Sequence, residues 1–410
     1  MSDIYHMTAP TQWTDPPRMF SYSTLSSIQE CPLRWQLEHS RFGDFKTFPS
    51  RPFARTMTGT IIHETLEHLF RALVRAGLPP RSDRRFREVM QEVAPFQLIR
   101  DKLAKARDAL SQHPRGRGVV IRETDATLYA KVASLFQRQY RPSLSQRDAL
   151  RCYQAPAAHR DHSPAPSPAS SSSAALLQRL NTSGTLTEQY ITHPTLPIRG
   201  VIDLVRKTQQ GVVLADFKTG KRRDSHSKQL TLYSLMWWRS TGSLPAFAEV
   251  VYFETTQRVD INEELLEQEE ARLRETIHEL TQLLQSTPAP ARLNPNCSYC
   301  SVRHCCEAYW LDNERRRASG EDVNDVQVTV EAVRGEQGFV GLTASGESIA
   351  AVYRNGTPMG SEDIEPGQSL RILQGRIRDE ALELNSFTEM FFIHHPTTRL
   401  KESPTQDTLG

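Results

Sequence analysis

An apolar run that ends in an acid and a lysine most constrains how this chain can fold. Residues 212–221 read VVLADFKTGK, so four apolar residues lead directly to Asp216, and Lys218 follows two positions later. A short apolar run of this kind is typical of a buried strand. Side chains two positions apart on a strand point to the same side. The pattern therefore predicts a carboxylate and an ammonium side by side at the end of a buried strand.

A second acid is placed to join them. Asp203 lies thirteen residues before Asp216, in the apolar segment 198–205, and two antiparallel strands joined by a turn near 207–211 would bring both acids together. Two carboxylates at one spot suit a hard divalent cation such as Mg²⁺, which can polarise a phosphoryl oxygen. Lys218 could then orient the attacking water or stabilise charge on the phosphate. For a lone D-x-K, an ordinary strand-end salt bridge is the alternative interpretation.

The predicted elements describe a mixed α/β core followed by an all-β tail. Pro- and Ser-rich residues, about 155–178, predict a disordered linker. From residue 326 to 395, short alternating runs separated by Gly and Pro predict a small β-barrel or sandwich. Apolar periodicity predicts a helix at 58–76, and richness in Arg, Ala, Leu and Glu predicts helices at 81–112 and 120–140. Strand-like segments follow at 186–193, 198–206 and 211–217, then a helix around 229–238, a strand at 247–254 and an acidic helix at 262–285.

Four short motifs appear in the order found in the RecB-type nuclease family of the PD-(D/E)XK superfamily, which the chain resembles. They are GTIIH at 59–63, GVID at 200–203, DFKTG at 216–220 and QLTLY at 229–233. The resemblance implies a mixed sheet flanked by helices and Mg²⁺- or Mn²⁺-dependent cleavage of DNA. We therefore expect a nuclease domain at 18–315, with a helical insertion at about 80–150, and a separate OB-like β-barrel at 324–397. The chain departs from the superfamily pattern in its long linker and in Ile202, which replaces the proline before the first Asp.

The resemblance also assigns roles to individual residues. His63, Asp203 and Asp216 would bind the metal, with the carbonyl of Phe217 as a further ligand, and Lys218 would be the catalytic lysine. Other matched or neighbouring positions have accessory roles: Glu188 is an accessory acid, Gln229 and Tyr233 contact DNA or brace the site, and Lys221, Arg222 and Arg223 either meet phosphates or form a solvated turn.

The cysteines suggest a second metal centre. Cys297 and Cys300 form C-x-x-C, Cys306 follows, and Cys31 lies far upstream next to a proline. Four thiolates hold either Zn²⁺ or a [4Fe–4S] cluster. The spacing resembles the iron–sulfur branch of the family, as in AddB and CRISPR adaptation nucleases, which implies a structural [4Fe–4S] cluster. In the zinc alternative, His304 and Cys305 are further possible ligands. Cys152 stands apart and is interpreted as an incidental thiol.

Charge and composition bear on location and partners. No run of about 18 apolar residues occurs, and residues 1–13 lack the features of a signal peptide, so we expect a cytoplasmic protein without a membrane span. Residues 1–250 hold 35 Lys and Arg against 21 Asp and Glu, whereas residues 251–410 hold 15 against 27. The basic half suits nucleic acid, although solvated helix faces would give the same excess.

Partners follow from what the sequence lacks. It contains no G-x-x-x-x-G-K-[ST] motif, so a helicase or ATPase working with it would be a separate chain. The tail at 326–395 has 5 Lys and Arg against 10 Asp and Glu, which favours protein docking over a single-stranded DNA groove. The alternative to a nuclease is a non-catalytic adaptor subunit that binds DNA or a partner and carries a structural zinc site.

Overall fold

The computed structural model describes residues 4–141, 173–321, 323–354, 356–362, 364–378 and 380–393. The chain forms two compact units. The α/β unit consists of Asp15–Gln36 and Arg51–Arg292, and the all-β unit consists of Met1–Thr14, Leu37–Ser50 and Leu293–Gly410. Both the mixed α/β core and the all-β C-terminal part predicted from the sequence are confirmed at this level. Among the helices in these described ranges, none is both long and apolar enough to cross a membrane.

The α/β unit is built on a five-stranded sheet in the order β1-β2-β3-β4-β5. Its first three strands form an antiparallel meander, β4 runs parallel to β3, and β5 returns antiparallel to β4. The parallel step needs a crossover, and helix α9 provides it. The strands are β1 Thr185–Thr192, β2 Arg199–Thr208, β3 Gly211–Phe217, β4 Phe247–Val251 and β5 Thr256–Asp260.

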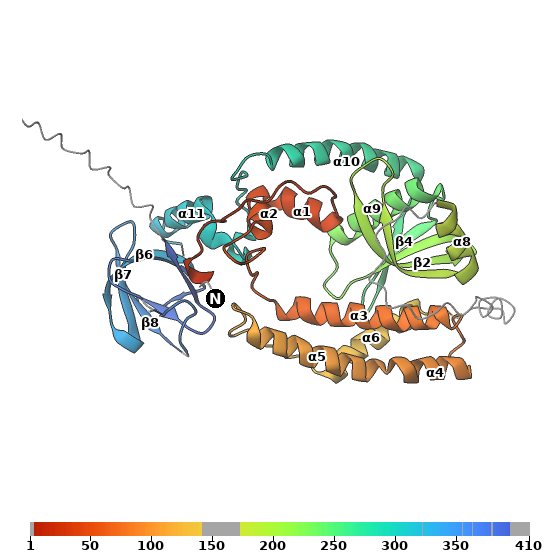
Figure 1. Cartoon of the computed structure of the whole chain (residues 1–410), viewed down its shortest axis with the longest axis horizontal. Helices are drawn as coiled ribbons and strands as arrows, with labels where there is room; N and C mark the ends of the chain where they lie inside the picture. Colours follow the sequence, from red (N-terminus) through yellow and green to blue (C-terminus); the bar gives the residue numbers. More distant parts are fainter. Residues whose placement is uncertain are drawn as a thin grey trace, which may run out of the picture. The chain divides into compact units, whose positions relative to one another are not determined.

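Helices cover both faces of this sheet. One group packs its apolar residues in a core with Leu204, Ala215 and Phe217; it contains α3 Ala54–Arg75, α4 Arg84–Val93, α5 Pro95–Gln112 and α6 Asp125–Gln139. The other group packs with Val205, Leu214 and Val250; it contains α1 Tyr22–Glu30, α8 Ser173–Ser183, α9 Asp224–Thr241 and α10 Glu263–Leu283. Figure 1 shows α3 and α5 on one side of the strands and α10 on the other. Helix α2 spans Pro32–His39.

Three elements differ from the sequence prediction. The helix expected at 81–112 is two helices, because Ala94 has a left-handed φ of 43° and Pro95 starts α5. The strand expected at 247–254 ends at Val251, and β5 follows it as a separate antiparallel strand. The linker expected at 155–178 is shorter, because α8 begins at Ser173; residues 155–172 lie outside the described ranges.

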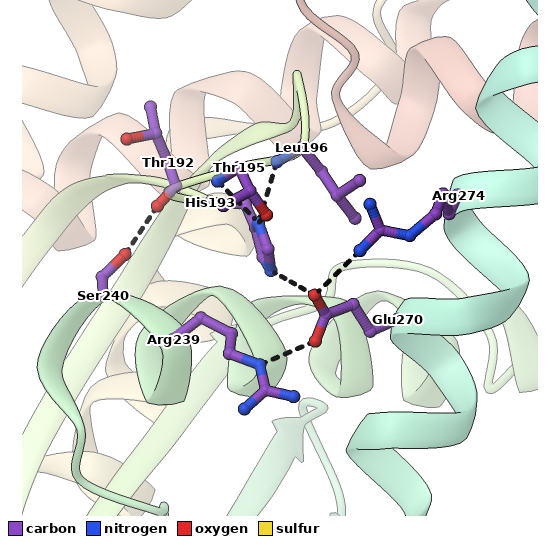
Figure 2. A network of polar contacts seen from close by, with 8 residues as sticks. All are labelled: Thr192, His193, Thr195, Leu196, Arg239, Ser240, Glu270 and Arg274. Carbon is purple, nitrogen blue, oxygen red and sulfur yellow. Dashed lines mark hydrogen bonds and ion pairs between the residues drawn. The ribbon is translucent and has the colours of Figure 1, made fainter.

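A polar network fixes the connection between β1 and β2 against the helices behind it (Figure 2). The buried His193 ring accepts the backbone N–H groups of Thr195 and Leu196 at Nδ1, at 3.2 and 3.0 Å. Its Nε2 faces Glu270 of α10 at 3.6 Å, and Glu270 also pairs with Arg239 of α9 at 2.7 Å. Burial lowers the pKa of His193. A neutral ring that accepts at Nδ1 carries its proton on Nε2, so it can donate toward Glu270.

The all-β unit contains a seven-stranded sheet in the order β10-β11-β8-β7-β6-β9-β12. Strand β11 is parallel to β8, and the other neighbouring pairs are antiparallel. The strands are β6 Val326–Val333, β7 Gly338–Leu342, β8 Ser348–Tyr353, β9 Ser369–Leu373, β10 Arg376–Arg378, β11 Ala381–Leu384 and β12 Glu389–Ile393. Helix α11 Glu307–Ala318 and the 3₁₀ turns η1 Ile4–His6, η2 Cys297–Tyr299, η3 Arg303–Cys305 and η4 Gly335–Gln337 complete it.

Two buried arginines tie the cysteine-rich segment to this sheet. Arg303 pairs with Asp325 at 2.5 Å and donates to the carbonyl of Cys300 at 2.9 Å. Arg371 of β9 pairs with Glu307 at 2.7 Å and donates to the carbonyl of His304 at 2.6 Å. Residues from 293 onward therefore group with the C-terminal strands. The expected boundary between 315 and 324 differs from this division, because buried polar contacts bind the two sides of it together.

Candidate active site

Two carboxylates meet where β2 and β3 separate. The ladder between these strands pairs Leu204 with Ala215, so Asp203 and Asp216 are the next residue on each strand. Asp203 Oδ2 accepts the backbone N–H of Phe217 at 2.7 Å. The side chain thus takes over a donor that the ladder no longer uses. Packing of the Phe217 ring on Phe70, with centroids 5.8 Å apart, anchors this end of β3 to α3.

A third carboxylate comes from β1. The pairs Thr187–Leu204 and Gln189–Ile202 flank Glu188 and keep the same register, which sets Glu188 across from Asp203. Glu188 has a left-handed φ of 45°, a backbone state that costs a non-glycine residue energy and occurs at functional sites. Three neighbouring strands therefore each contribute one acid to the same end of the sheet.

Burial raises the pKa of all three acids, and the charge of a neighbouring acid adds to each shift. Burial, followed by the charge of Asp203, raises the pKa of Asp216 to about 7. Burial raises the pKa of Asp203 to about 6, although the N–H of Phe217 opposes this shift. Burial and the charge of Asp203 raise the pKa of Glu188 to about 8. Three carboxylates that resist ionisation in one place form a site that a cation would stabilise.

Lys218 supplies one positive charge beside them. Its Nζ lies 2.6 Å from Oδ2 of Asp216, so the two side chains do project to the same side, as strand alternation predicts. Apart from this ion pair, Oδ2 of Asp216 accepts no hydrogen bond from a described residue. This buried oxygen retains a lone pair for a further ligand.

Helix α3 brings a histidine and a fourth acid to the strands. Nδ1 of His63 lies 3.7 Å from Oδ2 of Asp203, and burial lowers the pKa of His63, so its ring is neutral and able to ligate a metal. Glu67 lies one helical turn further along, and its charge raises the pKa of both Asp203 and Glu188. Glu67 is absent from the four motifs; its only signal in the sequence is its i+4 spacing from His63.

Two motif glycines allow the elements to approach one another. A Cβ on Gly59 of α3 would lie 3.0 Å from Oγ1 of Thr219, so the first motif packs directly on the third. A Cβ on Gly200 of β2 would lie 2.6 Å from the ring of Tyr233. Tyr233 is 7% exposed, and its hydroxyl accepts from Gln229 at 2.7 Å. The two residues of the fourth motif thus bond to each other against the second motif.

The turn that follows Lys218 is basic and solvent-exposed. Lys221, Arg222 and Arg223 are all exposed and precede α9. Behind them, Nδ1 of His226 lies 2.8 Å from the hydroxyl of Tyr252. Burial, followed by the charge of Lys218, lowers the pKa of His226. Neither His226 nor Tyr252 belongs to a recognised motif, so sequence reasoning missed both.

The cysteines are distributed over both units. Cys31 is in the α/β unit and is buried, and its Sγ accepts the backbone N–H groups of Arg34 and Arg292 at 3.4 and 3.5 Å. Cys297, Cys300 and Cys306 are in the all-β unit and are half-buried. Sγ of Cys297 accepts the N–H of Asn294 at 3.3 Å. His304 is fully buried, with its ring stacked on Phe391 at 3.9 Å, which favours a core role for it.

The donor set at the sheet end fits a hard divalent cation. In the described ranges, no group of three or more His, Cys, Asp or Glu side chains lies close enough together to hold a metal ion as the side chains stand. The chemistry nevertheless agrees: carboxylate oxygens and a neutral imidazole are available, one buried oxygen lacks a hydrogen-bond donor, and three acids have raised pKa values. Oxygen-rich sites of this kind suit Mg²⁺ or Mn²⁺.

Comparisons with known proteins agree with this geometry. No curated protein matches the chain. A solved structure titled "Crystal structure of SSO0001" is 20% identical, with a TM-score of 0.20, and the match covers 33% of this chain and 68% of that one; a similarity this low carries no argument. A comparison with protein families matches residues 19–307 to the PD-(D/E)XK nuclease superfamily. That range includes the α/β sheet, the three acids on its strands and Lys218, and the chain therefore belongs to the PD-(D/E)XK nuclease superfamily.

Proposed function

We propose that the chain is a metal-dependent deoxyribonuclease that acts at DNA ends, as an exonuclease does. It hydrolyses phosphodiester bonds at the end of the β1-β2-β3 meander. The observation that carries the proposal is the pairing of Lys218 with Asp216 at 2.6 Å, beside Asp203 and His63. An ordinary structural salt bridge would not need further carboxylates with raised pKa values around it.

The residues have distinct roles in this proposal. His63, Asp203 and Asp216 would hold Mg²⁺ or Mn²⁺, with the carbonyl of Phe217 as a further ligand. When bound, the metal would supply Lewis-acid polarisation of the phosphoryl oxygen. Lys218, beside Asp216, orients the attacking water and stabilises charge developing on the phosphate.

Other residues shape the site without taking part in bond cleavage. Tyr233, held by Gln229, braces Gly200 of β2 and faces the DNA backbone. Lys221, Arg222 and Arg223 form an exposed cationic turn that contacts phosphates. Glu188 is an accessory acid, and the charge of Asp203 helps to raise its pKa.

A cleavage assay tests the proposal. End-labelled single- and double-stranded DNA is incubated with Mg²⁺, Mn²⁺ or EDTA. Asp216→Ala and Lys218→Ala are expected to abolish cleavage and to preserve DNA binding, since affinity is spread over many phosphate contacts. Asp260→Ala and Lys207→Ala are matched controls, because Asp260 lies on β5 with its side chain 83% exposed and the exposed side chain of Lys207 donates to Asn181, away from the carboxylates. Cleavage by Asp216→Ala at the wild-type rate would refute the assignment.

We further propose that Cys31, Cys297, Cys300 and Cys306 hold a structural [4Fe–4S] cluster. Support comes from the spacing of the four cysteines and from the backbone N–H groups that point at Sγ of Cys31 and Cys297; such donors stabilise the thiolates of cluster ligands. The spectrum and metal content of protein purified without oxygen test this proposal. Stoichiometric zinc in a colourless protein would contradict it.

The tail is proposed to be an OB-like module that docks a protein partner such as a separate helicase or ATPase. Support comes from strands β11 and β12, which are separated by four residues and pair with β8 and β9 on different sides of the meander. The chain thus joins both sides of the sheet within a few residues, and a small antiparallel sheet of short strands is the composition from which OB-like folds are built. Repair, recombination and defence against foreign DNA are pathways that suit such an enzyme. The competing function is a non-catalytic adaptor, which the cleavage assay would reveal by the absence of any metal-dependent product.

A further inference from the structure

A basic groove opens beside the carboxylates in the α/β unit. It has a volume of about 640 Å³ and lies between the C-terminal half of α3, helix α8 and the start of β1. Figure 1 shows α8 beside the strands and α3 along the same unit. Its lining includes Arg71, Arg75, Arg179, Ser183, Thr185 and Thr187. Among the described residues that line it, none is acidic, so the groove has a net positive charge.

Two of these arginines have their charge available to a ligand. Arg75 and Arg179 are exposed, and neither forms an ion pair with a residue of the described ranges. Arg71 instead pairs with Glu67. Arg71 and Arg75 are four residues apart on α3, which puts them on one helix face about 6 Å apart along the axis.

The groove borders the candidate active site on two elements, β1 and α3. At its edge on β1, Thr187 is the residue before Glu188, and three residues of strand from Thr185 to Glu188 span about 10 Å. At its edge on α3, Arg71 pairs with Glu67 and its charge lowers the pKa of Glu188. A strand whose scissile phosphate lies at Asp203 and Asp216 would therefore meet this groove within a few nucleotides.

We propose that this groove binds the phosphates of the DNA strand on one side of the cleaved bond, with Arg75 and Arg179 as the phosphate contacts. The inference rests on the proposed nuclease function. It assigns that function a direction, because the substrate strand leaves the carboxylates along α3 and α8. An acidic protein segment could bind the same arginines. The position of the groove beside the proposed cleavage site favours DNA instead, and the experiment below distinguishes the two ligands.

The first measurement is the salt dependence of DNA binding in EDTA, where no cleavage occurs. Each lost phosphate contact lowers the slope of log K against log salt by about 0.7 for a single strand. The double variant Arg75→Ala/Arg179→Ala is therefore expected to lower the slope by about 1.4. Arg122→Ala is the matched control, because Arg122 is exposed and does not line the groove. A slope equal to that of the wild type would overturn the proposal, as would an equal change in the control.

The second measurement locates the contact on the DNA. Single methylphosphonate substitutions neutralise one phosphate at a time, on either side of the cleaved bond, in single-stranded and duplex oligonucleotides. The wild type is expected to lose affinity at one to three consecutive positions on one side. In the double variant those positions are expected to lose little further affinity, because the arginines that read them are gone. If each methylphosphonate lowers the affinity of the double variant as much as it lowers that of the wild type, the groove is refuted as the binding site.

These outcomes separate the groove from the nuclease function. If the wild type cleaves DNA and the double variant binds it with unchanged slope, the groove proposal alone fails. If the wild type neither cleaves nor binds DNA, the proposed function fails and the groove proposal fails with it. A double variant that loses binding to poly-glutamate and retains DNA binding would assign the groove to an acidic protein segment and overturn the proposal.

Discussion

Replacing Asp216 by asparagine is expected to stabilise the metal-free protein at neutral pH while abolishing its activity. Asp216 is 3% exposed, and burial with the charge of Asp203 raises its pKa from an ordinary 3.8 to about 7. Asparagine keeps the shape of the protonated acid and cannot ionise. The cost of the buried charge is thereby removed from the folded state.

The size and pH range of the effect follow from linkage. Between pH 4 and pH 7 the unfolded chain releases this proton and the folded chain keeps it, so wild-type stability falls as pH rises. The shift from 3.8 to about 7, at 1.36 kcal/mol per pKa unit, corresponds to about 4 kcal/mol above pH 7. The stability difference between Asp216→Asn and wild type should therefore be near zero at pH 4 and approach 4 kcal/mol at pH 8.

Denaturant unfolding in EDTA at several pH values measures this difference. The fluorescence of Trp35, Trp237 and Trp238 reports on the α/β unit. Asp260→Asn is the matched control, since its side chain is 83% exposed, and no stabilisation is expected from it. Mg²⁺ at pH 8 should stabilise the wild type by mass action and leave Asp216→Asn almost unchanged. A variant that is less stable than wild type at pH 8 in EDTA would refute the reasoning.

Three further predictions concern packing and the second unit. Gly200→Ala places a methyl group 2.6 Å from the Tyr233 ring, so we expect a loss of about 1–3 kcal/mol by overpacking together with slower cleavage; unchanged unfolding and kinetics would contradict this. Asp325→Ala leaves Arg303 buried without its 2.5 Å partner, which should lower the unfolding free energy of the all-β unit by about 3–5 kcal/mol. The double variant Asp325→Ala/Arg303→Met should recover part of this loss in the same denaturation assay. Cys300→Ala is expected to remove the visible absorbance of protein purified without oxygen, and a spectrum identical to that of the wild type would exclude this cysteine as a ligand.

Local patterns in the sequence predicted much of the α/β unit. Short apolar runs located β2 and β3 to within about two residues of their observed ends, because a strand buried on both faces needs consecutive apolar residues. Strand alternation placed Lys218 and Asp216 on one side of the strand end, where the side chains meet at 2.6 Å. These features depend on residues a few positions apart, and the chain encodes them directly.

Only the tertiary structure decided which distant residues share the site and where the units divide. Glu67 joins the carboxylates because α3 packs against the sheet, and Glu188 lies across from Asp203 because of the register in which β1 pairs with β2. Arg303 and Arg371 assign the cysteine-rich segment to the all-β unit through buried ion pairs, whereas composition suggested a boundary after it. Charges on separate elements interact strongly only when packing brings them together and removes the water between them. The distance between two such charges cannot be read from a single sequence.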